Sequence, residues 1–162
     1  MNADAFRYLY DYHFAENRKI WDSYVTSLSP EQFIQEVNYS YGSVRNQIVH
    51  LMNTEHSWFA ELRRHEIAQL PDPIKIKDRD ILRADWDAVE RDIRSYLASL
   101  QDDMLFEKPI VYEGDENLIV WQVLLHVVNH ATDHRAQILR VLNDMGVKTG
   151  PQDLIFYIFD HM

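Results

Sequence analysis

Three histidines with helical spacing are the residues of this sequence best suited to chemistry. His126, His130 and His134 lie four residues apart in the stretch LLHVVNHATDHRAQILRVL. On an α-helix this spacing places successive imidazoles one turn apart on one side, where two of them can bind one metal ion. The zinc-protease signature also needs a glutamate directly after the first histidine, and here Ala131 follows His130. The spacing therefore permits a metal site and argues against metallopeptidase chemistry.

A helical wheel separates the three histidines. Four residues shift the face of an α-helix by about 40°, because each residue turns about 100°. The wheel places His126 at the border of the solvent-facing side, His130 on the flank and His134 on the buried side. Buried imidazoles need partners, since an unpaired polar group costs free energy in a core. The pattern leaves two interpretations open: metal ligands, or core histidines that hydrogen bond to carboxylates or carbonyls.

Four segments with helical periodicity must position these side chains. We expect helices over about 3–28, from Ser43 as N-cap to the PDP motif at 71–73, from about 78–80 to 100, and from about 118 to 144. The apolar tail PQDLIFYIFDHM predicts a short C-terminal helix packed on the rest. The stretch FEKPIVYEGDENLIVW is predicted to be either a short hairpin or an extended crossover. The pattern indicates an all-α protein with a single domain over 1–162, built as a four-helix bundle.

The composition excludes several classes of function. The 162 residues include no cysteine, so disulfides, thiolate metal ligands and a cysteine nucleophile are absent. A formal charge of −10, from 26 acidic and 16 basic residues, opposes binding to phosphate backbones. The sequence has no apolar run of membrane-spanning length, and its N-terminus does not look like a secretion signal. We therefore expect a cytoplasmic protein with neither nucleic acid nor membrane as a partner.

The third ligand of a catalytic metal site is not identified by spacing. Such a site usually has three protein ligands and an open position. On a wheel of the second segment, His50 points away from the main apolar stripe, so periodicity alone predicts a surface histidine there. That stripe consists of Ile48, Met52, Glu55, Phe59 and Leu62.

The order of the motifs resembles the DinB/YfiT-like family of small helical bundles. The resemblance covers nearly the whole chain, through YDYHFAENRKIWDSYVTSL, LSPEQF, GSVRNQIVHLMNTEHSWF, WQVLLHVVNHATDHRAQILRVLNDMG and PQDLIFYIFD. It implies a four-helix bundle with long crossovers in up-down-down-up order. It also implies a divalent metal on three histidines, which match His50, His130 and His134, although the wheel turns His50 away from the core.

The resemblance implies several functions between which the sequence does not choose. Relatives include thiol-dependent transferases and isomerases, so we expect a metal-dependent hydrolase or thiol S-transferase that acts on a small molecule, with a low-molecular-weight thiol as candidate co-substrate. The ion is Zn, Ni, Fe or Cu, which imidazole ligands do not distinguish. The alternatives are a non-catalytic metal- or ligand-binding stress-response protein and a dimeric structural bundle. A homodimer is the expected assembly.

Four polar residues are expected to support the site. Glu55 and Gln137 are candidates to fix the imidazole tautomers, because a metal-bound histidine usually donates its other N–H to a partner. Asn17 and Tyr12 are candidates to line the pocket. For each residue, ordinary structural hydrogen bonding is the alternative. Substrate specificity is expected in the loops at 70–80 and 102–117.

Overall fold

The computed structural model describes residues 2–64 and 78–162. Helix accounts for 70% of the structure, and the described residues contain no strand, which confirms the all-α prediction. The helices are α1 (Ala3–Ser23), α2 (Pro30–Ile34), α3 (Val44–Leu62), α4 (Arg79–Ser99), α5 (Val120–Asp144) and α6 (Leu154–Asp160), with short 3-10 turns η1 (Val25–Ser27) and η3 (Met104–Phe106).

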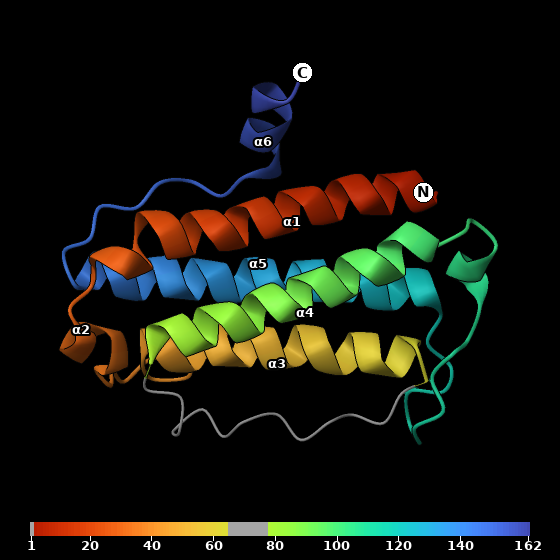
Figure 1. Ribbon diagram of the computed structural model, residues 1–162, viewed down its shortest axis with the longest axis horizontal. Helices are drawn as coiled ribbons and strands as arrows, with labels where there is room; N and C mark the ends of the chain where they lie inside the picture. Colours follow the sequence, from red (N-terminus) through yellow and green to blue (C-terminus); the bar gives the residue numbers. More distant parts are fainter. Residues whose placement is uncertain (1, 65–77) are drawn as a thin grey trace.

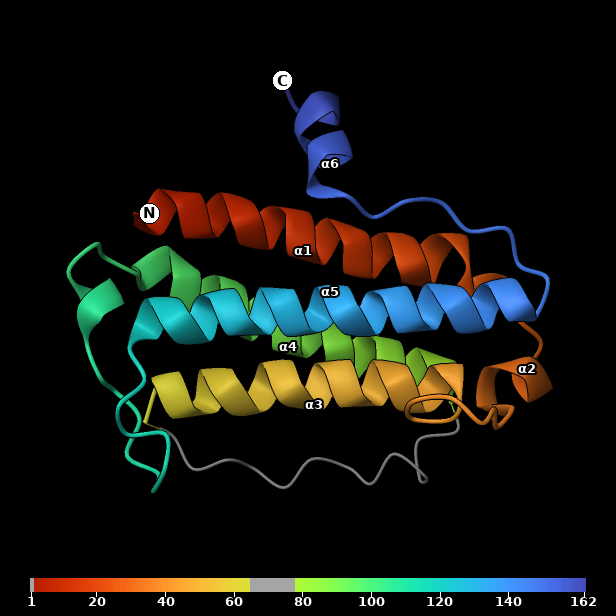
Figure 2. The same ribbon diagram turned by 180° about the vertical axis from the view of Figure 1, so that it is seen from behind.

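The four long helices lie side by side along the long axis of the molecule (Figure 1). α1 and α5 run in one direction, and α3 and α4 run in the other. α5 lies between α1 and α3 (Figure 2) and contacts both of them, while α4 also packs on α1 and α3. The seam between α3 and α5 therefore brings together the two segments that carry the candidate metal ligands.

Local hydrogen bonds set the helix ends. Ser43 caps α3 as predicted, because its Oγ accepts a hydrogen bond from the Asn46 N–H at 3.1 Å. Periodicity predicts a first helix that reaches residue 28, but α1 ends at Ser23. The hydroxyls of Thr26 and Ser27 donate to the carbonyls of Asp22 and Tyr24 at 2.9 and 2.6 Å. Such bonds compete with helix continuation, so the chain tightens into a 3-10 turn.

Three other predictions about the elements need correction or fall outside the described residues. α3 ends at Leu62, well before the PDP motif, and that motif lies outside the described ranges together with most of the expected specificity loop at 70–80. The stretch between α4 and α5 forms turns and the η3 turn without strands, so it is a crossover and not a hairpin. α6 is helical and contacts α1 through the ring of Tyr157, which lies 5.7 Å from those of Tyr8 and Tyr12, but none of its residues is buried and most of it projects from the bundle (Figure 1).

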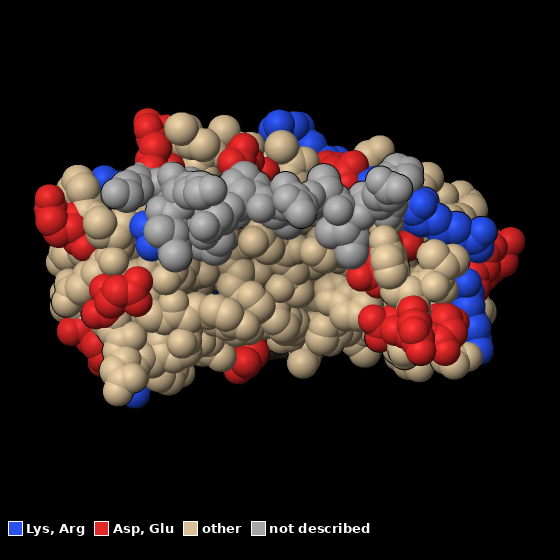
Figure 3. Space-filling model, turned by 90° about the horizontal axis from the view of Figure 1, so that it is seen from below, with Lys and Arg blue, Asp and Glu red and all other residues tan. Residues whose placement is uncertain are grey.

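Charged side chains are unevenly spread over the face seen from below α3 (Figure 3). Most of the acidic and basic atoms in this view lie toward its margins, and uncharged residues form much of its middle. The basic atoms are scattered and form no continuous patch among the described residues of this face. None of the described helices has the length and hydrophobicity that a membrane span requires.

Candidate metal centre

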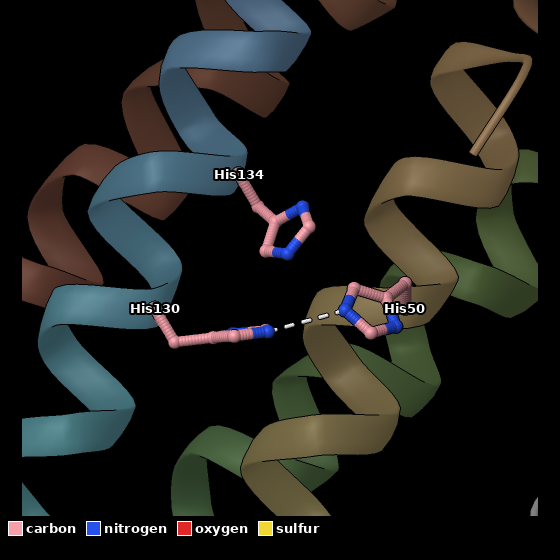
Figure 4. A group of neighbouring side chains, drawn as sticks. All are labelled: His50, His130 and His134. Carbon is pink, nitrogen blue, oxygen red and sulfur yellow. Dashed lines mark hydrogen bonds between the residues drawn. The ribbon is translucent and has the colours of Figure 1, made fainter. Parts of the chain in front are cut away.

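Three histidines converge where α3 faces α5 (Figure 4). His130 and His134 reach from successive turns of α5 toward His50 on α3. The Nε2 atoms of His50 and His130 are 3.2 Å apart, and the ring of His134 lies 4.3 Å from that of His130 and 4.5 Å from that of His50, measured between centroids. One ligand atom from each residue lies within 4.8 Å of the others. The arrangement is a three-nitrogen cluster from two adjacent helices.

The geometry of this cluster fits a bound divalent ion. Two nitrogens that each lie about 2.1 Å from one ion, at tetrahedral or right angles, are about 3.0 to 3.4 Å apart. The observed 3.2 Å between His50 and His130 falls in this interval. Among the described residues, no carboxylate hydrogen-bonds to His50, His130 or His134, so the alternative of core histidines held by carboxylates does not describe these three residues.

The electrostatics of the cluster keep its imidazoles neutral. Burial, followed by the proximity of the other imidazoles, lowers the pKa of His50 to about 4 and that of His130 to about 4. Burial also lowers the pKa of His134. A metal binds the neutral form of histidine, whose nitrogen lone pair is free. At neutral pH the site is therefore prepared for an ion without first having to release protons.

The helix packing explains why periodicity misjudges His50. α3 contacts α4 with one side and α5 with another, so the side away from the main stripe is also covered. His50 is half-buried there, and the prediction of a surface histidine was wrong. His126, in contrast, is exposed, in agreement with its place at the solvent border of the wheel.

Tyr41 is a neighbour of the cluster that the sequence did not reveal. Its ring stacks on His50 with a centroid distance of 3.9 Å and an interplanar angle of 18°. The following residue, Gly42, has φ +87°, and a Cβ there would lie 2.1 Å from a carboxylate oxygen of Glu36. The positive φ favours glycine at this position, whereas the Glu36 carboxylate is the end of an exposed, flexible side chain that can move aside. In the sequence, the only feature that pointed to this region was the YGS turn before α3. That turn predicted a helix N-cap and not a contact between Tyr41 and His50.

Gln137 ties the loop before α3 to α5 and also interacts with the His134 side chain, whose pKa is lowered by burial and raised less strongly by Gln137. Its amide nitrogen donates to Oδ2 of Asp133 at 3.0 Å, and its oxygen accepts a hydrogen bond from the Ser40 hydroxyl. Because Tyr41 follows Ser40, this contact ties the loop that carries the stacked ring to α5. Gln137 thus lies beside the site both through this loop and through His134.

Glu55 lies in a buried network and does not bond to the three clustered histidines. It accepts hydrogen bonds from His13 at 3.0 Å, Asn17 at 3.1 Å and Trp86 at 3.0 Å. Although burial alone would raise the pKa of Glu55, these donors outweigh it and lower that pKa. Burial lowers the pKa of His13, which stays neutral. Glu55 was predicted to fix the tautomer of a metal-binding histidine. It instead fixes the tautomer of His13, which is not one of the candidate metal ligands.

Arg135 completes this network and is not singled out by the sequence pattern. It is fully buried and contacts Nδ1 of His13 at 3.0 Å and Oδ1 of Asn17 at 3.1 Å. It also donates to Gln152 in the tail at 2.9 Å. Asn17 and Tyr12 belong to this core and to the α1–α5 side, where the Tyr12 hydroxyl donates to the Gln152 carbonyl at 2.6 Å. Neither residue bonds to the clustered histidines.

The structure is a helical bundle in which two packed helices bring three neutral histidines together. This places the chain in the class of helical proteins with a candidate metal site. The chain belongs to the DinB family, which it matches over residues 1–161. It is similar to protein DinB of Bacillus subtilis (strain 168), with 25% identity over 170 aligned residues, 98% of this chain and 96% of that protein. The family resemblance inferred from the motifs is confirmed.

Proposed function

We propose that this chain is a divalent-metal-dependent enzyme that acts on a small molecule at His50, His130 and His134. The observation that carries the proposal is the convergence of three imidazoles whose ligand atoms lie within 4.8 Å of one another. Three protein ligands leave coordination positions for water and substrate, as in catalytic metal sites, whereas structural sites are closed by four ligands. The low pKa values of His50 and His130, both about 4, support the same assignment.

The reaction class we propose is hydrolysis or thiol S-transfer. When bound, a divalent ion lowers the pKa of a bound water or thiol and so supplies a nucleophile near neutral pH. Because the chain has no cysteine, a thiol nucleophile has to come from a small molecule, and a low-molecular-weight thiol is the co-substrate we propose. The chain itself supplies three neutral ligands and, in Tyr41, a ring that covers one face of His50. An all-imidazole set suits Zn, Ni, Fe or Cu.

The up-down-down-up topology of the family is part of this proposal. The directions of the four long helices in Figure 1 support it, since α1 and α5 run one way and α3 and α4 the other. Two antiparallel neighbours, α3 and α5, then face each other with His50 opposite the pair on α5.

Metal content and turnover test the proposal separately. Protein purified without a histidine tag should hold close to one divalent ion per chain by elemental analysis. A panel of small thiols paired with electrophiles, and of hydrolysable esters and amides, should give product that disappears with a chelator and returns with the ion. Metal without turnover across the panel would instead favour a non-catalytic metal-binding protein of the stress response. Protein without metal after incubation with each of the four ions contradicts the proposal.

We also propose that the chain forms a homodimer through α6. This helix exposes Ile155, Phe156 and Phe159 at 48%, 47% and 62%, a large apolar surface for a seven-residue helix. A groove of about 570 Å³ lies between α1, α5 and the start of α6, and its apolar wall includes Leu9, Val128 and Ile155. A two-fold axis would pack Phe156 and Phe159 of each copy against the groove of the other.

Charge favours a second copy as the occupant of this groove. With a net charge of −10, two chains repel each other over most of their surfaces. Of the described residues that line the groove, Asp153 is the one charged side chain, so the copies can approach there with little repulsion. The tail that leads to α6 is anchored on the bundle, because Lys19 donates to the Pro151 carbonyl at 2.7 Å and Gly150 N–H donates to Tyr24 at 2.9 Å.

A further inference from the structure

We infer that the pocket between Trp58 and His126 receives an apolar, planar group of the substrate whose other end binds the metal. This inference rests on the proposed function and narrows its substrate class. The substrate is then a small molecule that carries a metal-binding head and an aromatic or similarly flat group about 12 Å away, the rise of the eight residues of α3 from His50 to Trp58.

The pocket adjoins the histidine cluster through His126, which lines the pocket and neighbours His130, whereas His50, His130 and His134 do not line it. The ring of His126 lies 5.8 Å from that of His130, one turn along α5, and the indole of Trp58 meets His126 edge-on at 5.3 Å. On the other side of the cluster, Tyr41 stacks on His50. A line of aromatic rings thus follows the α3–α5 seam from Tyr41 to Trp58, with the ligand atoms in its middle.

The size and lining of the pocket determine what it can hold. Its volume of about 280 Å³ is at the small end of ligand pockets, which typically measure about 300 to 1,000 Å³, and suits one ring. Its described walls are Trp58, Leu118, Gln122, Val123 and His126, of which none is Asp, Glu, Lys or Arg. An uncharged group is therefore favoured, because a charged group would lose its hydration without gaining a counter-ion.

The walls are held in place and leave apolar surface open. Gln122 accepts a hydrogen bond from the Ile119 N–H at 3.1 Å, which fixes its side chain at the start of α5. Val123 is buried, whereas Trp58 is half-buried and His126 is exposed. A ligand ring placed against Trp58 would remove apolar surface from water on both partners, which favours binding.

The experiment compares two hydroxamates that bind metal through the same head. The full chain, loaded with one equivalent of Zn²⁺, is titrated with acetohydroxamate and with 6-phenylhexanohydroxamate, whose flexible linker spans the distance to the pocket, by calorimetry. We expect 6-phenylhexanohydroxamate to bind at least about tenfold more tightly, because its ring is removed from water in the pocket. Trp58→Ala should abolish this preference and leave the metal content and the acetohydroxamate affinity unchanged. Tyr8→Ala, which removes an aromatic side chain 42% exposed on α1, is the control and should retain the preference.

A second variant guards against loss of folding in Trp58→Ala. Leu118→Trp should fill the pocket from its partly exposed loop wall and likewise remove the preference. If the wild type binds Zn²⁺ and acetohydroxamate without preferring the aromatic probe, the subsite is wrong while the metal site stands. The subsite is equally wrong if the preference survives in both variants. If the chain binds none of the metals, the proposed function fails and this inference fails with it.

Discussion

Nε2 of His50 and Nε2 of His130 lie 3.2 Å apart, although 80 positions separate the two residues in the chain. This contact exists because α3 packs against α5 with the face that carries His50. An ion bound by both helices would stabilise the folded state over the unfolded one, so the free energy of unfolding should depend on metal binding.

Replacement of a cluster histidine should remove the metal. We expect His130→Ala to weaken metal affinity by more than about 100-fold, because even the loss of outer partners of a metal ligand costs about 10- to 100-fold. His126→Ala is the matched control on the same helix, one turn away and exposed, and should keep its metal. Elemental analysis and competition with a chromophoric chelator measure both. Equal metal content in the two variants would refute the ligand assignment.

Removal of Arg135 should destabilise the fold strongly. Arg135→Ala leaves the buried His13, Asn17 and Glu55 without their cationic neighbour, so we expect a loss of about 3 to 5 kcal/mol in the free energy of unfolding. Arg140→Ala is the control on α5, because its pair with Asp144 is exposed and contributes little to stability. Urea denaturation followed by circular dichroism compares the two. A small effect of Arg135→Ala would show that the network is not essential to stability.

Acid should destabilise the protein through His13 and Glu55. The pKa of His13 is lowered from 6.5 in the folded state. Just below pH 6.5, therefore, His13 binds a proton more readily in the unfolded chain than in the folded one. The pKa of Glu55 is also lowered, so its stabilising contribution is present above 4.5 and is lost as the pH falls further. Both effects lower the free energy of unfolding as the pH falls.

His13→Gln tests this pH dependence, because an amide can still pair with Glu55 but does not titrate. Between pH 6.5 and 5 the variant should show a shallower slope, smaller by up to about 1.4 kcal/mol per pH unit, the contribution of one proton. His161→Gln, at an exposed position on the tail, should keep the wild-type slope. Identical slopes in all three proteins would mean that His13 titrates alike in the folded and unfolded chains.

Gly42 should be more sensitive to substitution than Gly114. Both have positive φ, +87° and +98°, but an added Cβ meets Glu36 only at Gly42 and open space at Gly114. We expect Gly114→Ala to cost about 1 kcal/mol of backbone strain and Gly42→Ala up to about 1 kcal/mol more, because the Glu36 side chain must give up its hydrogen bond to Asn46 to make room. Thermal unfolding measures the difference. Comparable losses would show that the loop next to Tyr41 adjusts freely.

Disruption of α6 should separate the proposed dimer. Phe156→Asp combined with Phe159→Asp adds charge to the exposed apolar face, and we expect sedimentation to shift from the mass of two chains to that of one. Ile81→Asp, which changes a side chain 55% exposed on α4, should leave the mass unchanged. A wild-type protein that sediments as a monomer at high concentration contradicts the dimer.

The sequence by itself determined the features that depend on neighbours along the chain. The spacing of His130 and His134 places them on successive turns because the helix period is local. Ser43 caps α3 for the same reason, since its partner is three residues away. The end of α1 was missed because Thr26 and Ser27 turn their hydroxyls back to the main chain, an outcome that hydrophobic periodicity does not encode.

Only the tertiary structure decided which distant residues meet. His50 reaches the pair on α5, Tyr41 stacks on His50, and Glu55 bonds to His13 and not to the cluster, because packing sets which helix faces which. A wheel describes one helix against an average interior, whereas α3 has two long helical neighbours with different side chains. Family resemblance identified His50 ahead of the structure, but the geometry that makes it a candidate ligand arises from the α3–α5 contact.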